Sequence, residues 1–582
     1  MRKRSIRLFF LFSCLALLSA HAQWTWKNPM EAGFPVVQNQ GWTAEIGNTY
    51  TRLPQRAKGL VRQPVWDLSR NSAGLAIHFY SDAPEIKVRY AVSGGLSMPH
   101  MPATGVSGVD LYQVNSDGKW NILVGGMPYG DSIQCHYTNI GKDKYHNLGY
   151  EYRLYLPLYN TVTGMEIGVP DSCRLDFIPV SPERPILLYG TSIAQGACAS
   201  RPAMAWGNIL QRSVGFPLVN LGFSGNGKLE KEMLDFINEI DARLYILDCL
   251  PNLTDRTEAE IELLVLNAVK QLRAAHSTPI LLVEHAGHSN AWTDTRKLEE
   301  YAHANRASRK AYETLQAEGV KDLYYLSHDE LALPADAWVD HIHPSDLGMQ
   351  AQATAVEKKV RKILRLPQGS IATTRAVTQR REPQTYEWQA RHRDILALNK
   401  SNPPRSVMLG NSITHFWGGE PKGPSVNGGD SWEKVMRPAG FHNLGCGWDK
   451  IENVLWRVYH DELDGFKAEQ VVLAIGTNNL AFNDNSEIVE GLRFLLAAIR
   501  ERQPEARVTV IGILPCRQKE GRIKELNLQI REMAVAGNAK FRDPGVRLLG
   551  KDGKIEESLF LDGLHPNQKG YQRIAKEIAG VD

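Results

Sequence analysis

The stretch that decides the fold runs Pro185-Ile-Leu-Leu-Tyr-Gly190-Thr-Ser192-Ile-Ala-Gln-Gly196. Its apolar first half is typical of a buried strand, which ends abruptly in Gly-Thr-Ser before a polar loop. A serine at the carboxyl end of a buried strand is well placed to be a nucleophile at the edge of an α/β sheet. The same pattern recurs at Ser406-Val-Met-Leu-Gly410-Asn-Ser412. The sequence therefore predicts two candidate nucleophiles on two sheets.

The two serines belong to an internal repeat. Strand-like runs alternate with longer helical patterns from Glu183 to Leu364 and again from about Tyr386, which predicts two doubly wound, mainly parallel sheets. The serines at 192 and 412 are 220 positions apart, and two later Asp-x-x-His blocks, at 340 and 562, are 222 apart. Matching blocks that keep their order and offset indicate a duplicated domain.

Each serine has a candidate base and a candidate orienting acid about 150 residues later. A serine hydroxyl needs a base to become a nucleophile, and the base needs a carboxylate that fixes its ring. Asp340-His-Ile-His343-Pro and Asp562-Gly-Leu-His565-Pro supply both groups on one tight turn. We therefore expect the triads Ser192–His343–Asp340 and Ser412–His565–Asp562.

Two loops in each half offer hydrogen-bond donors for a developing oxyanion. The first half has Asn220-Leu-Gly-Phe-Ser-Gly225 after one strand and Asp248-Cys-Leu-Pro-Asn252 after the next. The second half has Asn443-Leu-Gly-Cys-Gly447-Trp448 and Gly476-Thr-Asn478 at the matching places. A glycine lets backbone N–H groups approach an oxyanion, and an asparagine amide adds a side-chain donor.

The chain before the repeat differs in kind. From Trp24 to about Val180, short alternating segments such as 75–80, 85–90 and 109–114 are separated by Gly, Pro, Asn and Asp clusters. This pattern predicts an all-β sandwich or jelly roll. Its aromatic residues could form a sugar-stacking platform, but packing is the more common role; they are Trp66, Tyr80, Tyr112 and Trp120.

The first 22 residues are typical of a secretory signal. A basic start, the apolar run Leu8 to Leu18 and Ala20-His-Ala22 are its three parts. The run is too short to span a bilayer, and no later run approaches that length. Leu11-Phe-Ser-Cys14 loosely resembles a lipoprotein box, but the apolar run continues past Cys14. We therefore expect export to the periplasm or the medium, without a lipid anchor.

These patterns divide the chain into five parts. We expect a signal peptide at 1–22, a β-sandwich domain at 23–181, a first α/β domain at 182–366, a polar linker at 367–386 and a second α/β domain at 387–582. The length of 582 residues, 43% hydrophobic and 23% charged, suits several globular domains. The net charge of +3 argues against a nucleic-acid partner.

The remaining cysteines and histidines suggest no metal and no cofactor. Six cysteines remain after the signal, without C-x-x-C spacing, and their pairing cannot be deduced. The stretch Glu284-His-Ala-Gly-His288 reads as a strand-end loop near the first site rather than a metal site. We expect His341 to be structural, and Trp206 and Trp417, which follow the two serines, to pack in the core.

The ordered set Gly-x-Ser, Asn-x-Gly, Gly-x-Asn and Asp-x-x-His resembles the SGNH (GDSL-like) esterase superfamily. The second half, with Asn453-Val-Leu-Trp-Arg457 and Asp562-Gly-Leu-His-Pro-Asn-Gln-Lys-Gly-Tyr571, is similar to the platelet-activating-factor acetylhydrolase catalytic subunits. The first half and the β-rich segment resemble secreted bacterial SGNH proteins. The resemblance implies two flavodoxin-like three-layer domains behind a β-sandwich. It also implies nucleophiles, bases, acids and oxyanion donors at Ser192, Ser412, His343, His565, Asp340, Asp562, Gly225, Asn252, Asn478 and the loop Gly447–Trp448.

Two positions depart from the family pattern. Leu250 stands where the third block usually has glycine, and Trp448 stands where the second block has its donor glycine. The donor is a backbone N–H, which tryptophan also has, and its bulky ring could restrict the acyl pocket to a small group. Ile193 and Ile413 follow the serines, so the G-x-S-x-G elbow of the α/β-hydrolases is absent.

The resemblance implies a secreted esterase that removes small acyl groups, expected to be acetyl, from polysaccharides or oligosaccharides through an acyl-serine intermediate. Its partner is then an acylated carbohydrate. Two alternatives stay open: a lipid or lysophospholipid acylhydrolase, and a carbohydrate-binding protein in which one or both esterase domains are inactive.

Overall fold

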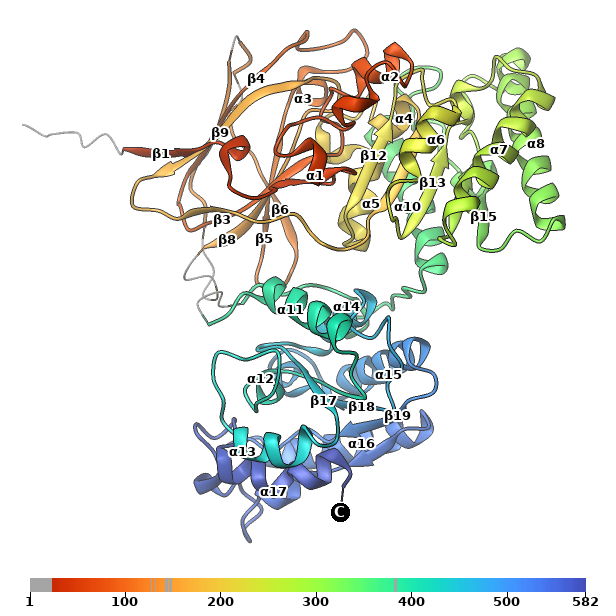
Figure 1. The fold of residues 1–582 in the computed structure, drawn as a ribbon. Helices are drawn as coiled ribbons and strands as arrows, with labels where there is room; N and C mark the ends of the chain where they lie inside the picture. The colour runs from red at the N-terminus through yellow and green to blue at the C-terminus, as the bar shows by residue number, and fades with distance from the viewer. Residues whose placement is uncertain are drawn as a thin grey trace, which may run out of the picture.

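The computed structural model describes residues 23–126, 128–130, 132–141, 145, 149–381 and 385–581. The expected signal peptide and Cys14 lie outside these residues. The chain forms three units, with the N-terminal β unit and the first α/β unit side by side and the second α/β unit below both in Figure 1. Within the described part, no helix combines the length and apolarity needed to cross a membrane.

The N-terminal unit consists of two antiparallel sheets packed face to face, which confirms the predicted sandwich. The sheets have the orders β1-β9-β4-β7 and β10-β3-β8-β5-β6, with β2 beside β3. Inward side chains such as Phe79, Val88, Tyr152 and Ile167 are fully buried between them. The strands are β1 Trp24–Lys27, β2 Val37–Gln38, β3 Ala76–Ser81, β4 Ile86–Val92, β5 Asp110–Val114, β6 Trp120–Leu123, β7 Ile133–Tyr137, β8 Tyr150–Tyr155, β9 Val162–Pro170 and β10 Leu175–Phe177.

The segment from Trp42 to Leu68 departs from the all-β expectation. It contains the short helices α1 (Thr43–Ile46) and α2 (Gln63–Leu68), and a proline in the first turn of α2 suits a helix start. Trp42, Val65 and Trp66 pack into the core of the first α/β unit rather than into the sandwich. The two N-terminal units are therefore fused through a shared apolar layer.

A strand of the sandwich also holds the first α/β unit through a buried acid. Asp110 lies in the stretch Gly108-Val-Asp-Leu-Tyr112 and accepts a hydrogen bond from the Ala203 N–H at 2.7 Å. The Arg201 guanidinium pairs with the same carboxylate at 3.1 Å. This contact fixes the loop that follows Ser192 against the sandwich.

The first α/β unit is a five-stranded parallel sheet with helices on both faces. Its strand order is β12-β11-β13-β14-β15, which places Gly190 beside Gly222 and Asp248. Helices α5 and α10 cover one face, and α6, α7 and α8 the other. The strands are β11 Ile186–Gly190, β12 Leu218–Gly222, β13 Leu244–Asp248, β14 Ile280–Val283 and β15 Leu323–Leu326. The helices are α3 Ala103–Val106 before the sheet, then α4 Ser192–Gln195, α5 Trp206–Val214, α6 Lys231–Ile237, α7 Glu258–Ala275, α8 Thr295–Ala317, α9 His328–Leu331 and α10 Asp346–Ile363.

The second α/β unit repeats this topology, as the near-constant offsets predict. The strand order β17-β16-β18-β19-β20 places Gly410 beside Gly445 and Ala474. Helices α14, α15 and α16 cover one face and α17 covers the other. The strands are β16 Ser406–Gly410, β17 Phe441–Gly445, β18 Gln470–Ala474, β19 Arg507–Ile511 and β20 Lys540–Arg542. The helices are α11 Trp388–Ser401, α12 Ser412–His415, α13 Gly429–Ser431, α14 Ile451–Tyr459, α15 Asn485–Arg502, α16 Glu520–Ala536 and α17 Gln568–Ala579.

The two α/β units meet at the amino ends of the strands of the first sheet, opposite the ends where Ser192 lies. Arg243, just before β13, pairs with both oxygens of Asp461 at 3.0 and 2.6 Å. His460 stacks on Phe216 with ring centroids 4.2 Å apart and bonds Glu183 at 2.7 Å. Glu183, Phe216 and Arg243 each lie just before a strand of the first sheet, whereas Ser192 follows a strand. The junction between the two α/β units therefore lies at the opposite end of these strands from Ser192.

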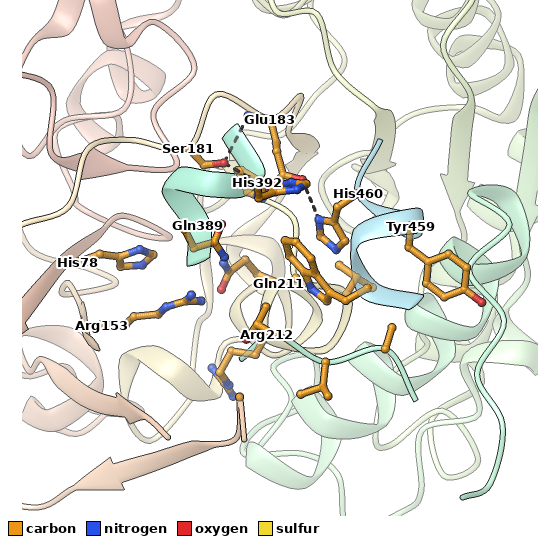
Figure 2. Close-up of a pocket in the computed structure, with 18 of the residues that line it drawn as sticks. His78, Arg153, Ser181, Glu183, Gln211, Arg212, Gln389, His392, Tyr459 and His460 are labelled. Carbon is orange, nitrogen blue, oxygen red and sulfur yellow. Dashed lines mark hydrogen bonds and ion pairs between the residues drawn. The ribbon is translucent and has the colours of Figure 1, made fainter. Parts of the chain in front are cut away.

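A cavity of about 180 Å³ lies where the three units meet. Figure 2 shows His78 and Arg153 of the sandwich facing Gln211 of the first α/β unit and Gln389 of the second, with the Glu183–His460 pair at its rim. Neither serine lines this cavity. The two serines lie instead at the carboxyl ends of β11 and β16.

The expected linker is packed rather than free where it is described. Arg380 forms a buried ion pair with Glu151 of the sandwich. The neighbouring Gln379 donates through Nε2 to the Gly447 carbonyl at 2.9 Å. These polar side chains are buried by hydrogen bonding and ion pairing, so the polar composition of the segment does not keep it free of tertiary contacts.

Two candidate active sites

Both serines stand at the first position of a short helix that follows a central strand. Ser192 opens α4 and Ser412 opens α12, and the residue before each caps that helix. Asn411 Oδ1, for example, accepts from the Ile413 N–H at 3.0 Å. A Cβ on Gly410 would lie 2.0 Å from Thr414 Oγ1, so only glycine fits two residues before the serine. This close approach explains the Gly-x-Ser spacing.

In the first unit, the three predicted triad residues form one hydrogen-bonded chain. Ser192 Oγ lies 3.0 Å from His343 Nε2, and His343 Nδ1 lies 2.8 Å from Asp340 Oδ2. The other carboxylate oxygen of Asp340 accepts from the backbone N–H groups of Ile342 and His343 at 2.8 and 2.7 Å. The turn that Asp-x-x-His forms therefore orients the acid toward its own histidine.

The second unit reproduces this chain. Ser412 Oγ lies 2.9 Å from His565 Nε2, and His565 Nδ1 lies 2.7 Å from Asp562 Oδ2. Asp562 Oδ1 accepts from the N–H groups of Leu564 and His565 at 2.9 and 2.8 Å. The side chain of Asp562 is 53% exposed, against 32% for Asp340. The two triads thus differ in solvation rather than in geometry.

The environment keeps both orienting acids ionised. Burial by itself would raise the pKa of Asp340, but the hydrogen bonds from His343 and Ile342 outweigh burial and lower that pKa to about 2. The pKa of Asp562 is lowered by the corresponding bonds from His565 and Leu564, again against partial burial. An ionised carboxylate holds the Nδ1–H tautomer, which leaves Nε2 as the acceptor for the serine hydroxyl.

A residue three positions after each serine holds the adjacent loop in the same way. Gln195 Oε1 accepts from the Ser224 N–H at 3.0 Å, and His415 Nδ1 accepts from the Gly447 N–H at 3.2 Å. Burial, followed by the charges of nearby arginines, lowers the pKa of His415 to about 2, so its ring is a neutral acceptor. The next N–H along each loop belongs to Gly225 or Trp448.

Gly225 and Trp448 share an unusual backbone conformation. Their φ angles are +68° and +65°, in the left-handed region that a bulky residue adopts only at a cost of about 1–3 kcal/mol. Strain of this kind is characteristic of functional loops. The N–H of Gly447 is directed at His415, which corrects the expectation that Gly447 is itself a donor and leaves Trp448 as the candidate.

The two asparagines of the third block lie beside these loops. Asn252 Oδ1 accepts from the Gly227 N–H at 3.1 Å, and Asn478 Nδ2 donates to the Asp449 carbonyl at 2.9 Å. Gly476 of the second unit has a φ of +119°, whereas Leu250 lies in a short 3-10 helix with its side chain 3% exposed in the core. The departure at Leu250 is thus accommodated by a different local backbone.

An arginine from outside each α/β sheet clamps the loop of the second block, and sequence reasoning missed both. Arg52 of the N-terminal segment donates to the carbonyls of Asn220 (3.3 Å) and Gly222. Arg391 of α11 donates to the carbonyls of Asn443 (2.8 Å) and Gly445. Both guanidinium groups are buried and bond only uncharged oxygens. No spacing rule connects them to the serines, so no sequence signal could have found them.

The other residues that the sequence singled out are structural. His288 Nδ1 bonds the His341 carbonyl at 3.1 Å, so the stretch from Glu284 supports the turn of Asp340. Glu284 itself pairs with Arg309 at 2.6 Å. Trp206 and Trp417 are 0% and 1% exposed, which confirms packing. Of the sandwich aromatics, Trp66 and Tyr112 are buried, Tyr80 is half-buried, and the Trp120 ring lies under Arg153. The cysteines of the described residues are all free thiols, Cys135, Cys173, Cys198, Cys249, Cys446 and Cys516.

Buried charge distinguishes the two units. Asp248 of the first unit is 2% exposed with Gln352 as its partner at 3.2 Å, and burial raises its pKa to about 7. The second unit has Ala474 at this place in the register. It instead buries Arg457 between Asp449 and Glu462, with all three side chains fully inaccessible.

Comparison with known proteins supports the architecture of a β unit followed by two α/β hydrolase units. Residues 183–361 and 408–573 each match the GDSL-like Lipase/Acylhydrolase family, and residues 24–175 match the N-terminus of Esterase_SGNH_hydro-type. A structure from Bacteroides ovatus, described as a GDSL-like lipase, is 32% identical with a TM-score of 0.54, over 59% of this chain and 98% of that one.

Curated relatives cover a smaller share of the chain. The human platelet-activating factor acetylhydrolase IB subunit alpha1 is 29% identical over 196 residues, which is 33% of this chain and 80% of the relative. The human alpha2 subunit is 26% identical over the same length, with 81% of the relative covered. The chain belongs to the GDSL-like lipase/acylhydrolase (SGNH) family of carboxylic ester hydrolases, with two such domains in tandem behind an SGNH-esterase N-terminal domain.

Proposed function

We propose that this protein is an exported serine esterase that hydrolyses small acyl esters, with acetyl as the acyl group, on polysaccharides or oligosaccharides. The observation that carries this proposal is the pair of Ser–His–Asp chains with matching hydrogen-bond lengths. In each unit the serine is the nucleophile, the histidine the general base and the aspartate the orienting acid. This mechanism requires neither a metal nor an organic cofactor.

The reaction begins when the serine oxygen attacks the ester carbonyl. His343 or His565 takes the hydroxyl proton through Nε2, and the new C–O bond places a negative charge on the carbonyl oxygen. When the tetrahedral intermediate collapses, the histidine gives that proton to the leaving alkoxide, and the sugar alcohol departs. Water then attacks the acyl-serine by the same route and releases acetate.

Backbone and side-chain donors stabilise the oxyanion. The serine's own N–H, the N–H of Gly225 and the Asn252 amide supply three donors in the first unit. In the second unit they are the N–H groups of Ser412 and Trp448 and the Asn478 amide. Each preorganised donor contributes about 3–4 kcal/mol to a lower barrier. The clamps by Arg52 and Arg391 hold the loops that carry the middle donor.

A small acyl group suits the second site in particular. Trp448 carries its ring beside the donor N–H, and the Arg381 guanidinium lies over that ring at 4.8 Å. The names of the curated relatives, acetylhydrolases, also point to acetyl. Support for a carbohydrate alcohol comes from the signal-like N-terminus and from the sandwich, which places His100 beside the first triad.

A lipid ester is the second candidate, because the motifs of the second half resemble the platelet-activating-factor acetylhydrolases. The two are separated by measuring acid release from acetylated xylan and pectin, from acetylated lysophospholipid, and from aryl esters of two to eight carbons. Acetate release from the polysaccharides with a steep fall beyond acetyl supports the proposal. Faster release from the phospholipid overturns the carbohydrate substrate, and inertness toward all esters favours a binding protein with inactive domains.

A further inference from the structure

The first active site carries two additional ligating side chains that its mechanism does not use. His100, from the sandwich loop between Met98 and Met101, is exposed and stacks on His343 with ring centroids 5.6 Å apart. Cys198 lies six residues after the nucleophile, is 5% exposed and adopts a left-handed φ of +66°. Its thiol donates to the His100 carbonyl at 3.3 Å. Two units of the fold thus bring a thiol and a second imidazole to the catalytic histidine.

The ligating atoms of these three side chains all lie within 4.8 Å of one another. His343 Nδ1 is taken by Asp340, so its Nε2 lone pair is the atom that can face a metal. A histidine whose other ring nitrogen donates to a carboxylate is the usual arrangement of a metal-ligating histidine. One sulfur and two imidazole nitrogens, with a fourth position open to water, form a donor set that favours Zn²⁺.

We propose that Zn²⁺ binds to His100, Cys198 and His343 and thereby reversibly inhibits the first hydrolase unit. The inference rests on the proposed catalytic role of Ser192 and His343. The bound ion takes the Nε2 lone pair that would otherwise accept the serine proton, so the hydroxyl loses its base. The only bonds formed are to the metal, and the thiol proton passes to solvent.

Cys198 is buried and hydrogen-bonded to the loop that carries His100, so its thiol is already placed for a ligating role. A divalent cation deprotonates a coordinating thiol outright. The exposed His100 side chain has the freedom to close the distance that a tetrahedral site requires.

Among the residues that the structure describes, no such cluster of ligating side chains surrounds His565, so the second unit is an internal control. Phe416 lies against His565, with ring centroids 6.0 Å apart. Gly418 stands six residues after Ser412, at the position of Cys198. Zinc at the same concentration should leave the second unit active.

The test measures hydrolysis of an aryl acetate by the full-length protein with one serine removed. In Ser412→Ala, where the first unit alone reacts, Zn²⁺ should inhibit completely and EDTA should restore the rate, whereas Mg²⁺ should have no effect. In Ser192→Ala the same zinc should leave the rate unchanged. Equal zinc inhibition of the two single variants would overturn the inference.

Ligand variants locate the site. Cys198→Ser and His100→Phe, the latter chosen to keep an aromatic ring on His343, should each raise the half-inhibitory zinc concentration at least about tenfold in the Ser412→Ala background. Cys173→Ser, a half-buried thiol away from any triad, is the matched control and should not change it. Inhibition is expressed against each variant's own zinc-free rate. An unchanged zinc response in Cys198→Ser would contradict the proposal.

Calorimetric titration with Zn²⁺ separates this inference from the proposed function. The wild-type protein should bind one zinc ion that both Cys198→Ser and His100→Phe lose. If Ser412→Ala hydrolyses no ester, the proposed function of the first unit fails, and the titration alone then decides the metal site. Binding that persists in both variants overturns it.

Discussion

The two hydrolase units reach one reacting geometry with different neighbours. Both align serine, histidine and aspartate within 2.7–3.0 Å, and both place a left-handed residue at the second block. In the first unit the clamping arginine comes from the segment between β2 and β3, and in the second it comes from α11. The α/β sheet therefore places the triad, whereas the oxyanion loop depends on segments of the chain outside the sheet.

Buried charge is where the units diverge most. The first unit buries Asp248 on β13, next to β11, with the uncharged Gln352 as its partner. The second unit instead surrounds its buried Arg457 with two carboxylates. A buried charge that lacks a counter-charge destabilises a fold unless it is neutralised, so the stability of the first unit should depend on the protonation of Asp248.

The largest effect is expected from the orienting acids. Asp340→Asn in the Ser412→Ala background should lower kcat by about 10⁴-fold, because the amide favours the wrong histidine tautomer. Asp562→Asn in the Ser192→Ala background should cost less, because Asp562 is 53% exposed and water weakens its interaction with His565. Steady-state rates on an aryl acetate measure both. Equal losses would show that solvation does not distinguish the triads.

Asp248 should make the stability of the first unit depend on pH. Its pKa is about 7 in the folded protein and 3.8 in the unfolded chain, so the folded state holds an extra proton between these values. The free energy of unfolding therefore falls as pH rises from about 4 to about 7, by an amount of the order of 4 kcal/mol, and is level above that. Asp248→Asn should remove this fall.

Hydrogen exchange of the β13 amides, compared between wild type and Asp248→Asn at each pH, checks this prediction. The β18 amides of the second unit, which has Ala474 at this position, provide the control and should not differ between the two proteins. A wild-type β13 that is as protected relative to the variant at pH 8 as at pH 5 would refute the assignment.

The arginine clamps should act on rate rather than on substrate binding. Arg52→Ala and Arg391→Ala each leave two strand-end carbonyls without their donor, at about 1–3 kcal/mol per group. We expect kcat of the adjoining unit to fall about 10- to 100-fold with KM little changed, while the other unit keeps its rate. Lysine at either position should recover only part of the lost kcat, because it lacks the guanidinium fork. A change confined to KM would exclude a positioning role.

The smallest effect concerns acyl selectivity. Trp448→Gly should relieve the left-handed strain and open the second acyl pocket, which raises the butyrate-to-acetate rate ratio about tenfold. Gly225→Trp tests the converse in the first unit and should lower that ratio. Paired rates on aryl acetate and butyrate in the single-serine backgrounds give the ratios. An unchanged ratio in Trp448→Gly would show that the ring does not line the acyl pocket.

Local chemistry made much of this molecule predictable. The motifs Gly190-Thr-Ser192 and Asp340 to His343 can be recognised in the sequence, because a close strand approach and a tight turn require those residues at fixed spacings. Arg52, Arg391 and His100 carry no such signal, since Arg52 and His100 reach the first site from the N-terminal unit and Arg391 reaches the second site from α11, outside the sheet. The helices near Trp42 and the buried Gln379 were missed for the same reason: tertiary packing decides their structure.

The most direct test of two working sites is the initial rate of aryl acetate hydrolysis by four proteins: wild type, Ser192→Ala, Ser412→Ala and the double variant. We predict that each single variant keeps the share of its intact unit and that the double variant loses at least about 10³-fold. Full activity in the double variant would contradict the assignment of both serines. Loss of all activity in one single variant would show that only one of the two assembled triads is catalytic.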